Sequence, residues 1–480
     1  MSAPDRWDLL VLGGGTAGIV AAKTAARLGA RVVLIERDRT GGDCLWTGCV
    51  PSKALLAAAD AAAGARSAGR FGVTVDEVRV DFARVMEHVH AAIRQIAPVD
   101  SIEALEAAGL TVRTGEGRFV GDNTLDLDGE NVRFTQAVVA TGAAPAAPPI
   151  PGLAELDFLT SDTVWDLTEA PRRVAVLGGG SIGCELGQGL SRLGIEVSVV
   201  EGAPRVLPRE DAAAASVVHR ALESDGVTIL TGQSVTSVVA SDSQSGWLVL
   251  DDGEEVAFDR LLVAVGRRPR TTDLGLDTVG VDVDERGFVV VDRRLRTTNP
   301  RIWAAGDLTG HPQFTHVAGV HGSLAASNAV LAVRRSVETT AVPRVTYTHP
   351  EVAAVGVDTG RERDGIRILT LDHRHVDRAV TEGLTDGLTR LAVDGRGRIL
   401  GATVVGPRAG ETLGELAIAV RRGLRTRDLA GITHAYPTWN DGPWNAAIAD
   451  VREQLDRPTT RRALHTLART RRWWLERRAA

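Results

Sequence analysis

One pattern occurs twice in this chain of 480 residues and limits its fold more than any other feature. In the first copy, an apolar run at residues 9–12 leads into Gly13, Gly15 and Gly18 and then into an alanine-rich segment. A second apolar run ends in Glu36, eighteen positions after the third glycine. Glycines at this spacing between a strand and a helix permit a tight turn and let a pyrophosphate approach the helix N-terminus, while the carboxylate accepts hydrogen bonds from a ribose. The pattern predicts a βαβ unit that binds a dinucleotide.

The second copy follows the apolar run at residues 174–177 and contains Gly178, Gly180 and Gly183. Its acidic residue, Glu201, again follows the third glycine by eighteen positions. A single motif of this kind is weak, and two plain βαβ units are the alternative. Because each copy follows an apolar run, opens a helical segment and places its acid at the same distance, we expect an α/β fold with two bound dinucleotides.

A pair of cysteines, Cys44 and Cys49, precedes an alanine-rich helical run at residues 51–65. Pro51 suits the first turn of a helix, so Cys49 is expected near a helix N-terminus, whose partial positive charge lowers the pKa of a thiol. Cys44 is expected in the loop before that helix. Such a pair can form a disulfide that accepts and passes on two electrons. A buried or metal-binding pair is the alternative.

The length, charge and cysteine content of the chain exclude several classes of protein. The length suits about three domains, and three cysteines exclude a disulfide scaffold and indicate a reducing compartment. The net charge of −6 gives no case for nucleic-acid binding. No apolar run reaches the ~20 residues that span a bilayer, and the polar N-terminus indicates no secretory signal, so a cytoplasmic location is expected. Lysine occurs only at Lys23 and Lys53, which makes Lys53 a candidate for a chemical role.

The segment of residues 41–53, with glycines before Cys44 and Pro-Ser-Lys after Cys49, resembles the redox-active signature of the flavin-dependent pyridine nucleotide–disulfide oxidoreductases. That family includes dihydrolipoamide dehydrogenase, glutathione reductase and mercuric reductase. The resemblance covers about residues 8–450. It implies two Rossmann-like dinucleotide-binding domains, one for FAD and one for NAD(P), and a C-terminal α+β dimerisation domain.

The resemblance also implies an interrupted domain order. Residues 1–150 begin the FAD-binding domain, residues 151–270 insert the NAD(P)-binding domain, and residues 271–335 return to FAD. Residues 340–450 form the dimerisation domain, and residues 451–480 remain as a basic tail outside the family pattern. Besides the two glycine patterns, the cofactor-binding residues implied are Thr141, Gly142, Gly306 and Asp307 for FAD, with Asp307 on the ribityl chain, and Gly266 for NAD(P).

The electron path implied by the family runs from NAD(P)H through FAD to the disulfide and then to a substrate. Cys49 is expected to be the thiolate that faces the flavin, and Cys44 the thiol that meets the substrate. Lys53 is expected near the reactive nitrogen of the flavin. Glu185 matches the residue that pairs with this lysine in the family, although an ordinary helix carboxylate is the alternative. No resident metal is expected.

The chain departs from the family at the segment that usually reads His-Pro-Thr-x-x-Glu and supplies a general acid–base from the partner subunit. Tyr436 replaces the histidine and Asp441 replaces the glutamate. A phenol has a pKa near ~10 and an imidazole near ~6.5, so Tyr436 is a poor base at neutral pH. His434, two positions earlier, could substitute or have only a loop role. Tyrosine at this position is a feature of mercuric reductases, but the printed sequence has no cysteine after Cys184.

We therefore interpret the chain as a homodimeric, mercuric reductase-like NAD(P)H oxidoreductase that reduces a disulfide, metal-ion or quinone-type acceptor. A disulfide reductase of the dihydrolipoamide dehydrogenase type is one alternative. A low-turnover flavoprotein used for redox sensing or interaction is another. Glu201 favours NADH, because a carboxylate repels the 2′-phosphate of NADPH, while Arg205 and Arg209 keep NADPH open.

The segment from Arg457 onward holds eight arginines, with Trp473 and Trp474 near its end. A basic helix with tryptophans can lie on an anionic membrane surface. A solvated terminal helix or a disordered arm is the alternative.

Overall fold

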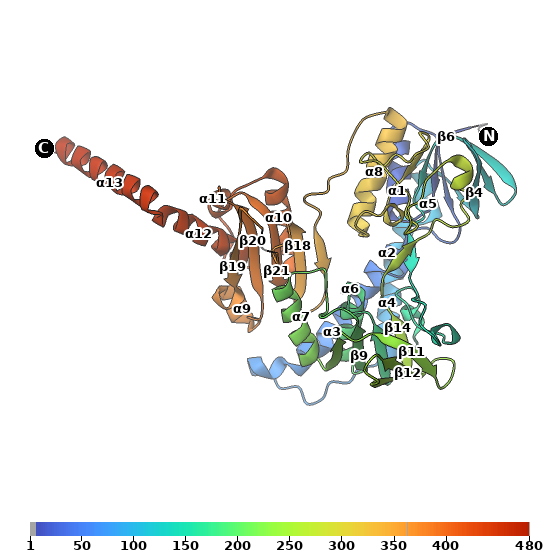
Figure 1. The fold of residues 1–480 in the computed structure, drawn as a ribbon, viewed down its shortest axis with the longest axis horizontal. Helices are drawn as coiled ribbons and strands as arrows, with labels where there is room; N and C mark the ends of the chain where they lie inside the picture. Colours follow the sequence, from blue (N-terminus) through green and yellow to red (C-terminus); the bar gives the residue numbers. More distant parts are fainter. Residues whose placement is uncertain (1–5, 362, 480) are drawn as a thin grey trace. The chain divides into compact units, whose positions relative to one another are not determined.

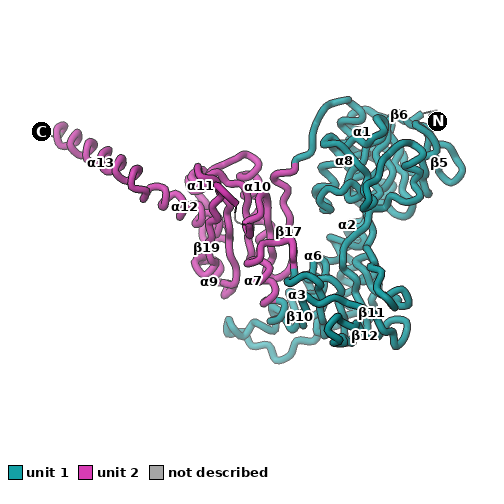
Figure 2. Tube along the Cα trace, viewed as in Figure 1, with its two compact units in different colours: residues 1–206, 222–338 teal, residues 207–221, 339–480 magenta. Residues whose placement is uncertain are grey.

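The computed structural model describes residues 6–361 and 363–479. The chain separates into two compact units, shown in different colours in Figure 2. The fold is mixed α/β, as expected from the sequence. Unit 1 comprises Met1–Val206 and Leu222–Glu338, and unit 2 comprises Leu207–Ala221 and Thr339–Ala480.

The first glycine pattern lies in a seven-stranded sheet of unit 1. Its elements and the helices near it are β1 (Trp7–Leu12), α1 (Thr16–Arg27), β2 (Val32–Glu36), α4 (Phe82–Ile96), α5 (Ile102–Ala107), β3 (Thr111–Thr114), β4 (Gly117–Gly121), β5 (Thr124–Leu127), β6 (Glu130–Val139), β16 (Ile302–Ala304) and α8 (Thr315–Leu331). The strand order is β3-β2-β1-β6-β5-β4, and β16 pairs with β6. The pairs β1–β2, β2–β3, β1–β6 and β6–β16 are parallel, whereas β4, β5 and β6 pair antiparallel.

The central strand β1 is buried on both faces, which explains its continuous apolar run. Leu9 and Val11 pack with small side chains of α1 and α8, including Ala21, on one face of the sheet. Leu10 and Leu12 pack on the opposite face in a separate apolar cluster. The alanines let α1 and α8 lie side by side against the sheet, as Figure 1 shows.

The cysteine segment forms two helices, α2 (Gly42–Trp46) and α3 (Cys49–Arg66). Cys44 was expected in a loop, but it lies inside the short helix α2. The second helix begins two residues before the expected start, so Cys49 is its first residue. Both sulfurs are therefore placed by helical backbone.

The second glycine pattern lies in a four-stranded parallel sheet of order β10-β9-β8-β14. An antiparallel three-stranded sheet, β11-β12-β13, accompanies it, and a short antiparallel pair, β7 and β15, lies where the chain enters and leaves this part. The elements are β7 (Ala143–Pro145), β8 (Arg173–Leu177), α6 (Ser181–Arg192), β9 (Glu196–Glu201), β10 (Val227–Thr231), β11 (Val235–Ala240), β12 (Gly246–Leu250), β13 (Glu255–Phe258), β14 (Arg260–Val263) and β15 (Arg267–Pro269). The helix between β9 and β10 in sequence, α7 (Ala212–Ser224), belongs mostly to unit 2 (Figure 2).

Unit 2 contains a five-stranded antiparallel sheet of order β17-β18-β21-β20-β19. Its apolar face packs against α10 and α12. The elements are β17 (Arg344–Thr346), β18 (Glu351–Gly356), β19 (Ile366–Asp372), α9 (Asp377–Glu382), β20 (Leu388–Asp394), β21 (Ile399–Gly406), α10 (Ala409–Arg422), α11 (Thr426–Ala430), α12 (Asp441–Asp456) and α13 (Pro458–Ala479). Among the described residues, no helix combines the length and the apolar character needed to cross a bilayer.

Candidate active site

The two glycine patterns form turns with the same geometry. Gly13 and Gly178 have positive φ angles of 108° and 110°, a conformation that favours glycine. A Cβ atom on Gly18 would lie 1.8 Å from the carbonyl oxygen of Gly13, and one on Gly183 would lie 1.9 Å from that of Gly178. The third glycine of each pattern is therefore required for close packing of helix on strand. The second one, Gly15 or Gly180, is the N-cap of the helix that follows, and its lack of a side chain lets a phosphate approach the helix N-terminus.

The two acidic residues are also held in the same way. Glu36 accepts hydrogen bonds from the backbone N–H of Gly14 at 2.6 Å and of Asp38 at 3.0 Å. Glu201 accepts them from Gly179 at 2.7 Å and Ala203 at 2.8 Å. Each oxygen keeps a lone pair, so each carboxylate can also accept a bond from a ribose hydroxyl beside its glycine turn.

The surroundings of the Asp307 carboxylate show whether this part of unit 1 can hold FAD. Burial raises the pKa of Asp307 to about 6, against the opposing charge of Arg267, and no hydrogen bond to its carboxylate is found among the described residues. Gly306, before it, has a φ of 89° and approaches Ala17 at the start of α1. A half-buried carboxylate that lacks donors, next to the first glycine turn, fits the hydroxyl groups of a ribityl chain.

The remaining predicted nucleotide residues lie where the chain crosses between the two sheets. Thr141 Oγ1 donates to the carbonyl oxygen of Arg270 at 2.7 Å, and the N–H of Arg270 donates to the carbonyl oxygen of Gly142 at 3.0 Å. Gly266 has a φ of 138° directly before β15. The structure thus brings Thr141 and Gly142 together with the segment after Gly266, although they are far apart in sequence.

The two thiols differ in acidity. Both are free and half-buried. The hydrogen bond from Cys44 is the main cause that lowers the pKa of Cys49 to about 6. Thr315, whose Oγ1 lies 3.3 Å from Cys49 Sγ, and the charge of Lys53 also lower this pKa, whereas burial raises it. The hydrogen bond between the two thiols, with burial, raises the pKa of Cys44. The position of Cys49 at a helix N-terminus adds to this preference. Cys49 is therefore the sulfur that carries the negative charge in the dithiol form.

Lys53 and Glu185 form an ion pair. Lys53 Nζ lies 2.8 Å from Glu185 Oε2 and 3.3 Å from Ser52 Oγ. The Glu185 side chain is only 10% exposed. A buried carboxylate is stabilised by a close ammonium, so this pair fixes Lys53 one turn after Cys49 on α3.

An ion cluster beside Cys44 was not predicted. Arg267 donates to the carboxylate of Asp43, and Arg270 lies 3.4 Å from the other Asp43 oxygen. Both arginines also lie within 4 Å of Asp162, whose pKa is raised by burial and by the charge of Asp43. Asp43 directly precedes Cys44, and Arg267 directly follows Gly266. Only this adjacency to predicted site residues could have pointed to the ion cluster from the sequence.

In unit 2, Tyr436 is exposed and its hydroxyl donates to Asp377 Oδ2 at 2.5 Å. This bond raises the pKa of Tyr436 further above that of imidazole. Asp441 does not contact the phenol: it is buried, accepts from the Thr438 N–H at 3.2 Å and leaves Oδ1 without a partner. Burial raises the pKa of Asp441. Sequence reasoning missed Asp377, which lies 59 positions from Tyr436.

His434 has a packing environment. Its Nε2 lies 2.7 Å from Glu415 Oε1 and its Nδ1 lies 3.0 Å from the carbonyl oxygen of Ile432. The ring stacks on Trp444 with centroids 5.1 Å apart, and the side chain is 7% exposed. These contacts favour the loop role for His434 over that of a substitute acid–base.

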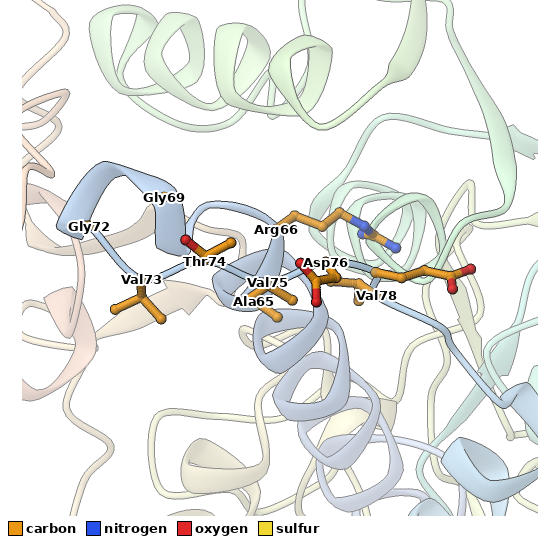
Figure 3. A pocket seen from close by; sticks show the side chains of 10 residues that line it. Ala65, Arg66, Gly69, Gly72, Val73, Thr74, Val75, Asp76 and Val78 are labelled. Atoms are coloured by element: carbon orange, nitrogen blue, oxygen red, sulfur yellow. The ribbon is translucent and has the colours of Figure 1, made fainter.

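A pocket of about 510 Å³ lies at the opposite end of α3 from Cys49 (Figure 3). Its lining includes Arg66, Val73 and Val75. Because α3 rises about 1.5 Å per residue, this pocket is about 25 Å from the cysteine along the helix. It therefore has no part in the sulfur chemistry.

The chain is similar to known proteins over most of its length. Residues 7–322 match the family described as pyridine nucleotide-disulphide oxidoreductase, and residues 342–447 match its dimerisation domain. A mercuric reductase of Streptomyces lividans is 37% identical, over 91% of this chain and 95% of that protein. A dihydrolipoyl dehydrogenase of Thermus scotoductus is 35% identical, over 92% of this chain and 97% of that protein.

Two solved structures are similar throughout. One is the Cu(II) complex of the HOCl-induced flavoprotein disulfide reductase RclA from Escherichia coli, with a TM-score of 0.84, 27% identity and coverage of 93% of this chain and 100% of that chain. The other is LpdA from Mycobacterium tuberculosis, also with a TM-score of 0.84 and 27% identity, covering 92% of this chain and 99% of that chain.

Proposed function

This chain belongs to the pyridine nucleotide-disulphide oxidoreductases, FAD-dependent enzymes that take electrons from NAD(P)H, and we propose that its acceptor is a thiophilic metal ion bound by Cys44 and Cys49. Thiolate ligands select soft metal ions. The observation that carries the proposal is Tyr436, a phenol hydrogen-bonded to Asp377 at the sequence position where the family's disulfide reductases have an imidazole. His434, the nearest imidazole in sequence, has acceptors at both ring nitrogens.

The roles of the chain's own residues follow from their contacts. Bound FAD would supply the two-electron chemistry that connects the nicotinamide with the disulfide. Cys49 holds the resulting thiolate, stabilised by Thr315 and Lys53, and Cys44 keeps its proton until a metal ion displaces it. Glu185 fixes Lys53 beside the site. For a divalent mercury ion, one NADH then yields the reduced metal, NAD⁺ and one proton.

Names of relatives support the same acceptor class. The Streptomyces relative is named mercuric reductase, and the similar E. coli structure is a Cu(II) complex. Dihydrolipoyl dehydrogenases are similar to about the same extent. Tyr436 favours metal-ion reduction over lipoamide reduction, because thiol exchange near pH 7 needs an acid–base with a pKa in that range.

We propose NADH as the electron donor. Both oxygens of Glu201 are fixed by backbone N–H groups at the second glycine turn, where the carboxylate would repel a 2′-phosphate. The test is kcat/KM for NADH against NADPH. We expect preference for NADH, and Glu201→Ala should reduce that preference by about tenfold. A wild-type preference for NADPH would contradict this assignment.

We also propose that the enzyme is a homodimer in a reducing, cytoplasmic compartment. It carries the family's dimerisation domain, and closed two-fold pairing is the commonest assembly. In this arrangement the Tyr436 segment would serve the cysteines of the other subunit. Light scattering should give twice the mass of the chain. A monomer at micromolar concentration with full activity would contradict the shared site.

The acceptor is tested by a panel of metal ions, disulfides and quinones with NADH as donor. We expect turnover with mercuric or cupric ions to exceed that with lipoamide or glutathione, and to be lost in Cys44→Ser and Cys49→Ser. Fast turnover of lipoamide with none of metal ions would assign a disulfide reductase instead. No turnover above flavin autoxidation with any acceptor would favour a redox-sensing role.

A further inference from the structure

The terminal helix α13 lies beyond the residues that match the dimerisation domain, which end at residue 447. Figure 1 shows it projecting from α12, away from the sheet of its own unit. Its side chains at residues 461–478 are exposed. We propose that α13 binds the surface of an anionic lipid bilayer.

The charge of this segment is opposite to that of the rest of the chain. Residues 457–480 contain eight arginines and a single acidic residue, Glu476. Removing these seven net positive charges from the chain's net charge of −6 leaves −13 for residues 1–456. The arginines are therefore concentrated on one helix rather than distributed over a basic protein. Clusters of this kind are attracted to anionic lipids within a Debye length of the surface.

The helix also has two faces. Leu464, Leu467, Trp474 and Leu475 fall on one side at helical spacing, and they are 42%, 66%, 37% and 48% exposed. At 100° per residue, Arg462 and Arg469 fall on the opposite side, whereas Arg471 and Arg478 fall on the apolar side. Long arginine side chains on the apolar side can extend to the lipid headgroups while the leucines remain buried, so leucines gathered on one side of a strongly basic helix suit a helix that lies in the membrane interface.

The tryptophans are arranged as at a bilayer interface. The guanidinium groups of Arg471 and Arg478 lie 4.5 Å and 4.0 Å from the ring of Trp474, and that of Arg477 lies 4.2 Å from the ring of Trp473. Arg471 and Arg478 lie on the apolar side, and these contacts hold their charged groups next to the ring of Trp474. Indole rings prefer the headgroup level, where guanidinium groups also meet lipid phosphates.

Two other occupants fit less well. A second copy of α13 would bring two strongly basic helices together, and like charges at this density repel. A nucleic acid would satisfy the arginines through its phosphates but would leave Leu464, Leu467 and Leu475 in water. An anionic bilayer accommodates both faces at once.

The test is co-sedimentation of the full-length holoenzyme with phosphatidylcholine vesicles, with and without phosphatidylglycerol. We expect binding only to the anionic vesicles and a loss of binding at high salt. Leu467→Glu changes the apolar stripe, and His465→Glu adds the same charge on the arginine face as a matched control. Because burying a leucine is worth a further factor of at least about ten, Leu467→Glu should bind at least tenfold more weakly than His465→Glu. Both positions are exposed, and retained FAD content and circular dichroism confirm intact folding.

Several results would overturn the proposal. These are no binding to anionic vesicles, equal binding to neutral vesicles, and equal losses in the two variants. Tighter binding of duplex DNA than of vesicles at the same salt, unaffected by Leu467→Glu, would assign the helix to nucleic acid. All of these are binding measurements, so they are independent of the electron acceptor.

Discussion

Lys53 Nζ lies 2.8 Å from Glu185 Oε2, and this ion pair joins the helix that begins at Cys49 to the helix that begins at the second glycine turn. The first helix carries Cys49 and Lys53, and the second begins at the turn proposed to bind the nicotinamide nucleotide. A second ion pair between the same helices, Asp60 with Arg192 at 2.5 Å, lies further along both of them. Both pairs hold the two helices together, but only the first one also positions Lys53, so variants of the two pairs separate these effects.

Glu185→Gln removes the charge that holds Lys53, and we expect NADH-dependent reduction of the flavin to slow by about tenfold, since small misplacements near reacting groups have effects of this size or larger. Asp60→Asn is the matched control and should leave the rate within about twofold. Stopped-flow absorbance of the FAD-loaded variants measures both rates. Equal effects in the two variants would show that the first pair only holds the helices together.

The acidity of Cys49 should be visible as a pH titration. In Cys44→Ser, which keeps a hydroxyl donor at position 44, we expect a long-wavelength absorbance of thiolate with bound flavin that appears above a midpoint near pH 6. The midpoint should rise in Lys53→Met and in Thr315→Val, because each change removes a group that stabilises the thiolate. An unchanged midpoint in both variants would contradict the assignment of these contacts.

Asp307 should make the apoprotein less stable as the pH rises. Its folded-state pKa, about 6, lies above the ordinary value of 3.8, so the folded chain binds more protons than the unfolded chain between these values. The free energy of unfolding should therefore fall from about pH 4 to pH 6, by up to about 3 kcal/mol. Denaturant unfolding of the wild type and Asp307→Asn measures this, and the variant should lack that part of the pH dependence. The same slope in both proteins would contradict it.

Tyr436→His should increase lipoamide and glutathione turnover by at least about tenfold, because a positioned imidazole typically contributes 10²–10⁴-fold to proton transfer. Tyr436→Phe is the control and should show no gain. Steady-state rates with both thiol substrates decide the outcome, and wild-type lipoamide turnover as fast as that with the best acceptor would refute the acid–base argument.

The nucleotide-binding parts of the fold could be predicted because their signals are local. Apolar runs, three glycines and an acid at fixed spacing recur at Gly13 and Gly178, and the structure gives both turns the same φ angle and the same backbone contacts. The placement of Cys49 at a helix start followed from Pro51 in the same way.

The contacts that complete the site were not predictable from local pattern. Asp43 and Arg267 are 224 positions apart, and Cys49 and Thr315 are 266 apart. A charged or hydroxyl residue in a loop has the same local pattern whether it faces water or a buried thiol. Cys44 was expected in the loop before the helix that Pro51 opens, but a short helix begins there after positive φ angles at Gly41 and Gly42.

The most direct test of the electron path is the anaerobic absorbance spectrum of the FAD-loaded Cys44→Ser and Cys49→Ser proteins at pH 8. We expect the long-wavelength thiolate–flavin band in Cys44→Ser without any reductant, because Cys49 is then free and ionised, and no band in Cys49→Ser even after NADH is added. A band in Cys49→Ser and none in Cys44→Ser would contradict the assignment of the two sulfurs, and its absence from both would contradict a thiolate next to the flavin.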